Sequence, residues 1–107
     1  MKYKIFIYPE FKEDFNNAYD YINHKFKAKK ASSNLRKSMQ KCILNLGTIP
    51  ESYLQLDDFE VANFPLRFCV CENFYILFTV VNKKVNIYNF VYSRSEKFRS
   101  KYISDES

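Results

Sequence analysis

The stretch LRFCVCENFYILFTVVNKKVNIYNFVYSRSEKFRSKY, residues 66–102, decides the fold of this 107-residue chain. Apolar and aromatic segments cover residues 66–71, 74–81 and 85–92, and short polar turns separate them. This pattern predicts three β-strands joined as an antiparallel meander. The middle segment, FYILFTVV, is apolar almost throughout, which predicts burial on both faces or a central place in the sheet.

A basic segment follows the last of these strands and ends in Tyr102. We therefore expect positive charge and hydrogen-bond donors at one edge of the sheet. The whole chain carries a formal net charge of +5. Residues 48–66 form an exception, because this segment contains acidic residues and no basic residue. Such a balance suits a polyanionic target or an acidic protein partner, although it also suits a simple solvated surface. The candidate binding residues are Arg67, Arg94, Lys97, Arg99 and Lys101.

The first half of the chain predicts one strand and two helices. Residues 2–8 alternate in polarity like a strand, and Pro9 suits the first turn of a helix. Two apolar stripes at helical spacing follow, one from Phe11 to Phe26 and one from Ala31 to Leu46. Gly47, the only glycine, falls where a left-handed helix cap is expected. The short linker between the stripes predicts an antiparallel helical hairpin.

Residues 48–65 show no clear period, and we expect a long loop there with room for one helical turn. The predicted order is thus β-α-α-β-β-β. It defines an α+β domain in which a helical hairpin packs on one face of a mostly antiparallel four-stranded sheet. We expect one domain over residues 1–107, with residues 103–107 as a tail.

Composition narrows the functional classes. No apolar run is long enough to cross a membrane and the N-terminus does not look like a secretion signal, so we expect a cytoplasmic protein with no membrane partner. Cys69 and Cys71 should point to one face of a strand, and we expect all three cysteines to be reduced, mostly buried thiols. Only His24, expected on the surface of the first helix, could join them as a zinc ligand. We therefore expect neither a metal nor a cofactor.

The order and spacing of several segments resemble the RelE/ParE superfamily of type II toxin–antitoxin toxins. The resemblance covers residues 2 to about 102, and no single motif in it is specific. The segments that carry it are YKIFI at 3–7 with Pro9-Glu10, EDF at 13–15, DYI at 20–22, Leu46 with Pro50, FPLR at 64–67, ENFYILFTV at 72–80 and VYSRSE at 91–96.

The resemblance implies the fold derived above and an activity that inhibits growth. RelE-like members cleave messenger RNA on the ribosome, and ParE-like members poison DNA gyrase. A cognate antitoxin neutralises both kinds by wrapping the toxin in a hetero-oligomer. Arg94 matches the arginine that follows the last strand in RelE-like enzymes, and Tyr102 stands near the place of their late tyrosine.

The cations that RelE-like enzymes carry on the sheet are mostly missing here. Arg67 is the only one in its strand, and Tyr75 and Ile76 stand where an arginine is expected. We therefore expect a ParE-like toxin. The alternatives are a ribosome-dependent endoribonuclease using Arg67, Arg94 and Tyr102, or a degenerate member that binds an antitoxin without acting on a target. We expect the antitoxin to dock an acidic, amphipathic segment as a helix or as an added strand, with exposed Tyr and Phe near Arg as anchors.

Overall fold

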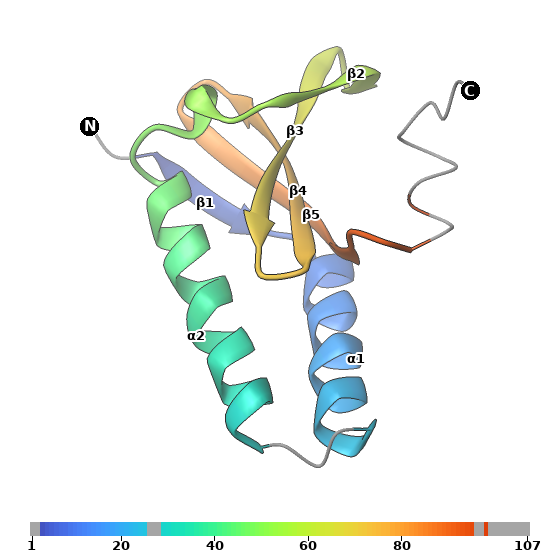
Figure 1. The fold of residues 1–107 in the computed structure, drawn as a ribbon. Coiled ribbons are helices and arrows are strands. Elements are labelled where there is room, and N and C mark those ends of the chain that lie inside the picture. Colours follow the sequence, from blue (N-terminus) through green and yellow to red (C-terminus); the bar gives the residue numbers. More distant parts are fainter. Residues whose placement is uncertain (1–2, 26–28, 96–97, 99–107) are drawn as a thin grey trace.

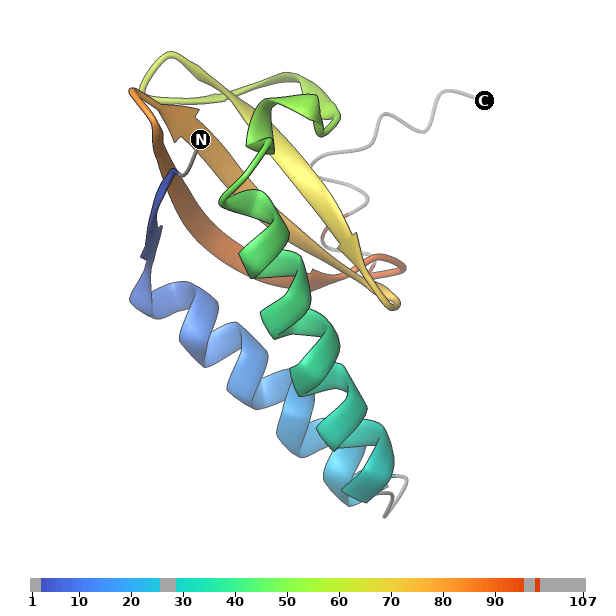
Figure 2. The same ribbon diagram turned by 90° about the vertical axis from the view of Figure 1, so that its left-hand side faces the viewer.

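The computed structural model describes residues 3–25, 29–95 and 98. A single five-stranded sheet is covered on one face by two helices (Figures 1 and 2). The ends of the helices farthest from strand β1 extend beyond the sheet (Figure 1). The elements are β1 (Lys4–Ile7), α1 (Pro9–Lys25), α2 (Lys29–Leu46), a 3₁₀ turn η1 (Pro50–Ser52), β2 (Gln55–Val61), β3 (Phe64–Cys71), β4 (Phe74–Val81) and β5 (Lys84–Tyr92).

The strand order across the sheet is β1-β5-β4-β3-β2. Strand β1 runs parallel to β5, and the other neighbours pair antiparallel. The predicted α+β class, the helical hairpin on one face and the meander are therefore confirmed. No helix within the described residues is long and apolar enough to cross a membrane.

The prediction of four strands and a long loop over residues 48–65 was wrong in one respect. That segment contains a fifth strand, β2. Gln55 pairs with Arg67, but the next pair is Glu60 with Pro65, so the register shifts between them. Asp58, with φ of 66°, lies within that shift. An irregular strand interrupted by two aspartates has no period of two, which explains why it was missed. The one helical turn expected in this segment is present as η1.

Both helices bury the predicted apolar stripes. Phe11 and Phe15 of α1 and Leu35 and Leu46 of α2 are buried against the sheet. At the start of α2 the buried residue is Ser32 rather than the predicted Ala31, and its hydroxyl donates to the Lys29 carbonyl at 3.0 Å. Phe26 lies outside the described residues.

Gly47 ends α2 without the predicted left-handed cap, because no glycine in the described residues has a positive φ. The amide of Gly47 instead donates to the Leu44 carbonyl at 3.1 Å, which is a 3₁₀-type closure of the last turn. Its own carbonyl accepts from the amide of Tyr3 at 2.9 Å. A Cβ at Gly47 would approach the Leu44 oxygen of α2 itself to 3.3 Å, so this glycine relieves crowding within the last turn of the helix.

Strand β4 is central and buried on both faces, as its composition predicted. Ile76 and Phe78 face the helices, while Leu77 belongs to a second cluster on the opposite face. A bulge in β5 adds Tyr88 between the pairs Leu77–Asn89 and Phe78–Ile87. The bulge shifts the alternation of β5 and lets residues three apart, Ile87 and Phe90, both pack toward the helices.

Candidate functional site

The side chain of Arg67 has a structural role and is not a freely exposed cation. It lies on β3 opposite Gln55, and its Nη1 donates to the backbone carbonyls of Glu51 at 3.1 Å and Tyr53 at 2.9 Å. These bonds attach the η1 segment to the sheet. Arg67 is half-buried, and the carbonyls of Glu51 and Tyr53 engage the donors of its Nη1.

Arg94 lies at a different place, in the exposed turn after β5. The amide of Ser93 donates to the Asn73 carbonyl at 2.9 Å, so this turn sits beside the β3–β4 hairpin turn. Within the described part of the chain, no hydrogen bond or ion pair engages the Arg94 guanidinium. Tyr92, two residues before it, is 45% exposed, so a tyrosine and an arginine are both exposed at this end of the sheet.

The sheet separates the two arginines that the sequence grouped together. Arg67 pairs with Phe78, whereas Tyr92, two residues before Arg94, pairs with Phe74. The four residue steps from Phe74 to Phe78 correspond to about 13 Å along a strand. The other predicted site residues, Lys97, Arg99, Lys101 and Tyr102, lie outside the described residues.

The sheet face opposite the helices carries an apolar and aromatic cluster. Phe98 packs edge-on against Tyr75 with ring centroids 5.2 Å apart, and Tyr88 shares a 2.8 Å hydrogen bond with Thr79. The cluster offers no side chain suited to proton transfer except tyrosine hydroxyls. Its members are Leu56, Leu66, Leu77 and Phe98, with Phe59, Phe68, Tyr75, Tyr88 and Val91 packed around them.

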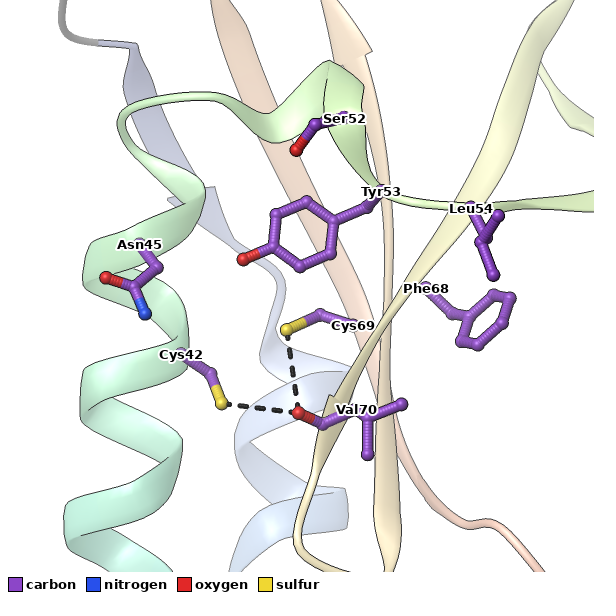
Figure 3. Close-up of a pocket in the computed structure, with 8 residues that line it drawn as sticks. All are labelled: Cys42, Asn45, Ser52, Tyr53, Leu54, Phe68, Cys69 and Val70. Atoms are coloured by element: carbon purple, nitrogen blue, oxygen red, sulfur yellow. Dashed lines mark hydrogen bonds between the residues drawn. The ribbon is translucent and has the colours of Figure 1, made fainter.

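An open cavity of about 360 Å³ lies where α2, η1 and β3 meet (Figure 3). Leu54 and Val70 at its rim are 71% and 60% exposed, so two large apolar side chains face solvent beside the cavity. The lining residues are Cys42, Asn45, Ser52, Tyr53, Leu54, Phe68, Cys69 and Val70. No pattern in the sequence singled out this surface, because Leu54 lies in a segment without a clear period and Val70 continues the apolar alternation of Leu66 and Phe68.

Next to the cavity, one edge of β3 lacks a neighbouring strand. The amide of Phe68 donates to the Leu54 carbonyl at 3.1 Å, and the last residue of β3 that pairs with β2 is Arg67. Among the described residues, no strand pairs with this edge at residues 69–71. The Val70 carbonyl there accepts from the thiols of Cys42 and Cys69. An edge of this kind can accept an added strand.

Helix α2 borders the cavity and is strongly basic. It contains five cations and no acidic residue, and all five are exposed. Arg36 is stacked over the rings of Tyr19 at 4.7 Å and Phe15 at 5.6 Å, which leaves the lysines as the open charges. They are Lys29, Lys30, Lys37 and Lys41.

The titratable groups near the cavity are poorly suited to acid–base catalysis at neutral pH. Burial, and secondarily the nearby thiol of Cys69, raises the pKa of Tyr53 above its ordinary value of 10.0. His24 is exposed near the end of α1, as predicted, and does not line the cavity. No group of three His, Cys, Asp or Glu residues in the described ranges is placed to hold a metal ion.

One chain of a solved toxin–antitoxin structure has this architecture. It belongs to the chromosomal ParDE TA system from P. aeruginosa and aligns with a TM-score of 0.65 at 15% sequence identity. The alignment covers 85% of this chain and 96% of that chain. No protein-family model matches the sequence, and no curated protein matches it. At this identity the likeness shows the fold, and the predicted RelE/ParE-like fold is therefore confirmed.

Proposed function

We propose that this protein is the toxin of a type II toxin–antitoxin module, that it acts in the ParE manner on DNA gyrase, and that a cognate antitoxin neutralises it. The single observation that supports this most is the alignment with nearly the full length of a chain from a ParDE system. The exposed pair Tyr92 and Arg94 provides a binding surface of the kind that such an activity needs.

The runner-up is a RelE-like endoribonuclease, and the geometry of Arg67 argues against it. Cleavage would need Arg67, Arg94 and Tyr102 around one phosphate to stabilise the developing charge. Arg67 is instead bonded to the carbonyls of Glu51 and Tyr53 and lies about four residues along the strands from the base of the Arg94 turn. The third possibility is a degenerate member that binds an antitoxin but acts on no target. The experiment that distinguishes gyrase poisoning from RNA cleavage also tests this possibility.

That experiment is induction of the chain in cells, followed by two readouts. A gyrase poison should induce the DNA-damage response while transcripts stay intact, whereas an endoribonuclease should arrest translation and cleave transcripts. Arg94→Ala should abolish growth inhibition, and Lys30→Ala on the exposed face of α2 is the matched control that should retain it. If overexpression of the wild-type chain is harmless, only the degenerate member without a target remains.

We further propose that the antitoxin docks at the α2–η1–β3 cavity. The exposed apolar rim, the unpaired edge at residues 69–71 and the acid-free helix α2 together fit an acidic, amphipathic segment. The anchors differ from those that we expected, because the rim is formed by aliphatic Leu54 and Val70 rather than by Tyr and Phe.

Two exposed leucines allow a matched test of this docking surface. Leu54 is 71% exposed and lines the cavity, whereas Leu44 is 73% exposed and does not line it. When the chain is co-expressed with the product of the adjacent reading frame, Leu54→Ser should weaken the complex about tenfold or more, equivalent to about 1.4 kcal/mol. Leu44→Ser should leave it intact. Equal losses in both variants would place the antitoxin elsewhere.

A further inference from the structure

Three cysteines from two elements gather at the seam between α2 and β3. Cys42 of α2 and Cys69 of β3 both donate to one acceptor, the carbonyl of Val70, at 3.6 and 3.8 Å. Figure 3 shows both sulfur atoms in the gap between the helix and the strand, directed toward that oxygen. Both residues also line the open cavity, whereas Cys71 does not.

The thiols differ in how readily they can react. Cys42 is half-buried, while Cys69 and Cys71 are only 4% and 1% exposed. Burial raises the pKa of Cys69 to about 12, and the neighbouring thiol of Cys42 contributes to this shift. Burial likewise raises the pKa of Cys71, again with a contribution from Cys42. Cys69 and Cys71 therefore remain protonated at neutral pH, and Cys42 is the thiol that a solute in the cavity reaches.

We propose that Cys42 is a modification site for low-molecular-weight disulfides, with Cys69 as its resolving thiol. The cavity admits the disulfide to Cys42, and the shared carbonyl holds the second sulfur beside the first. This inference is independent of the proposed toxin function, because it rests only on the placement of the thiols.

The chemistry has two exchange steps with glutathione disulfide as the oxidant. The Cys42 thiolate attacks one sulfur of the disulfide, a protein–glutathione bond forms, and the first glutathione leaves as a thiolate. Formation of this bond removes the Cys42 charge beside Cys69, and the small fraction of Cys69 that is ionised at pH 8 then attacks the Cys42 sulfur and releases the second glutathione. The two protein thiols lose two electrons to the oxidant, and their two protons go to the two glutathione thiolates. The product bond joins α2 covalently to β3.

Mass spectrometry of the purified full chain tests this sequence of steps. The chain is incubated with glutathione disulfide at pH 8, the remaining thiols are alkylated under denaturing conditions, and the peptides are mapped. The wild-type chain should end with a Cys42–Cys69 disulfide. Cys69→Ser, or Cys69→Ala if the serine variant unfolds, should stop with one glutathione on Cys42. Cys71→Ser is the matched control that should behave as the wild type.

Three results would overturn the proposal. They are an unmodified Cys42 in the wild type, a glutathione adduct that persists on Cys42 although Cys69 is present, and a disulfide from Cys42 to Cys71. Cys42→Ser should leave both remaining thiols unmodified in the folded chain, so rapid modification of Cys69 in that variant would also contradict the assigned order.

Discussion

At the scale of single residues, the two arginines that the sequence grouped together have opposite surroundings. The half-buried Arg67 attaches η1 to β3 through two backbone carbonyls, whereas the Arg94 side chain is exposed in a turn. A hydrogen bond from a charged donor contributes about 1.5–3 kcal/mol, while an exposed side chain with no described partner contributes little to stability. The same residue type therefore supports the fold at one position and is available to a partner at the other.

This difference predicts a separation of stability from function. Arg67→Ala should lower the free energy of unfolding by about 2–3 kcal/mol, because the carbonyls of Glu51 and Tyr53 lose their donor. Arg94→Ala, the matched control, should stay within about 0.5 kcal/mol of the wild type. Urea unfolding of both variants measures this. A stable Arg67→Ala variant would return Arg67 to the list of target-binding residues.

The buried thiols predict a loss of stability in alkaline solution. In the unfolded chain a thiol ionises near its ordinary pKa of 9.0, whereas in the folded chain the pKa of Cys69 is about 12. Between pH 9 and 12 the unfolded state therefore binds fewer protons, and the free energy of unfolding should fall by on the order of 1 kcal/mol per pH unit. Below pH 9 this group adds no pH dependence.

Cys69→Ala isolates this contribution from the tyrosines that titrate in the same range. Its free energy of unfolding should fall less steeply than that of the wild type as pH rises from 9 to 12, as measured by urea unfolding at each pH. Parallel curves for the two proteins would show that Cys69 ionises alike in the folded and unfolded chains.

At the scale of elements, one carboxylate adds hydrogen bonds to the apolar packing of α1 on the sheet. Asp14 Oδ2 accepts from Asn89 Nδ2 at 2.9 Å and from the amide of Phe90 at 3.1 Å. Both donors directly follow Tyr88, the residue that the bulge adds to β5. The carboxylate thereby takes up an amide beside the bulge and fixes α1 against β5.

Removing that carboxylate should loosen α1. Asp14→Ala should lower the free energy of unfolding by about 2–3 kcal/mol, because it leaves the half-buried donors of Asn89 and Phe90 unpaired. Glu13→Ala, its exposed neighbour, should change it by about 0.5 kcal/mol or less. Thermal unfolding followed by circular dichroism compares them, and equal shifts in the two variants would show that Asp14 does not hold the helix.

Helices and strands whose apolar residues recur with one regular spacing were predictable from the sequence, and the other elements were not. Both helices, β1 and the three meander strands have regular apolar spacing, and they were found in the predicted order. Strand β2 escaped because its pairing shifts around Asp58. The conformation of Gly47 was also mispredicted, and its carbonyl accepts from the amide of Tyr3, a tertiary contact that local sequence does not encode.

At the scale of the whole molecule, the candidate site was only partly predictable. Composition and order indicated a basic domain with a binding surface, and the alignment with a ParDE chain supports the proposed function. The α2–η1–β3 cavity could not be predicted, because it is formed by residues from three segments whose meeting depends on the fold. The separation of Arg67 from Arg94 likewise follows from strand register, which the sequence leaves open.

The most direct test of the proposed function is a supercoiling assay with purified DNA gyrase. The wild-type chain should inhibit supercoiling and trap cleaved DNA in proportion to its concentration. Arg94→Ala should lose this inhibition while remaining folded, and addition of the cognate antitoxin should restore supercoiling. Undisturbed supercoiling at concentrations that arrest growth, with ribosome-bound transcripts cleaved instead, would contradict the proposal.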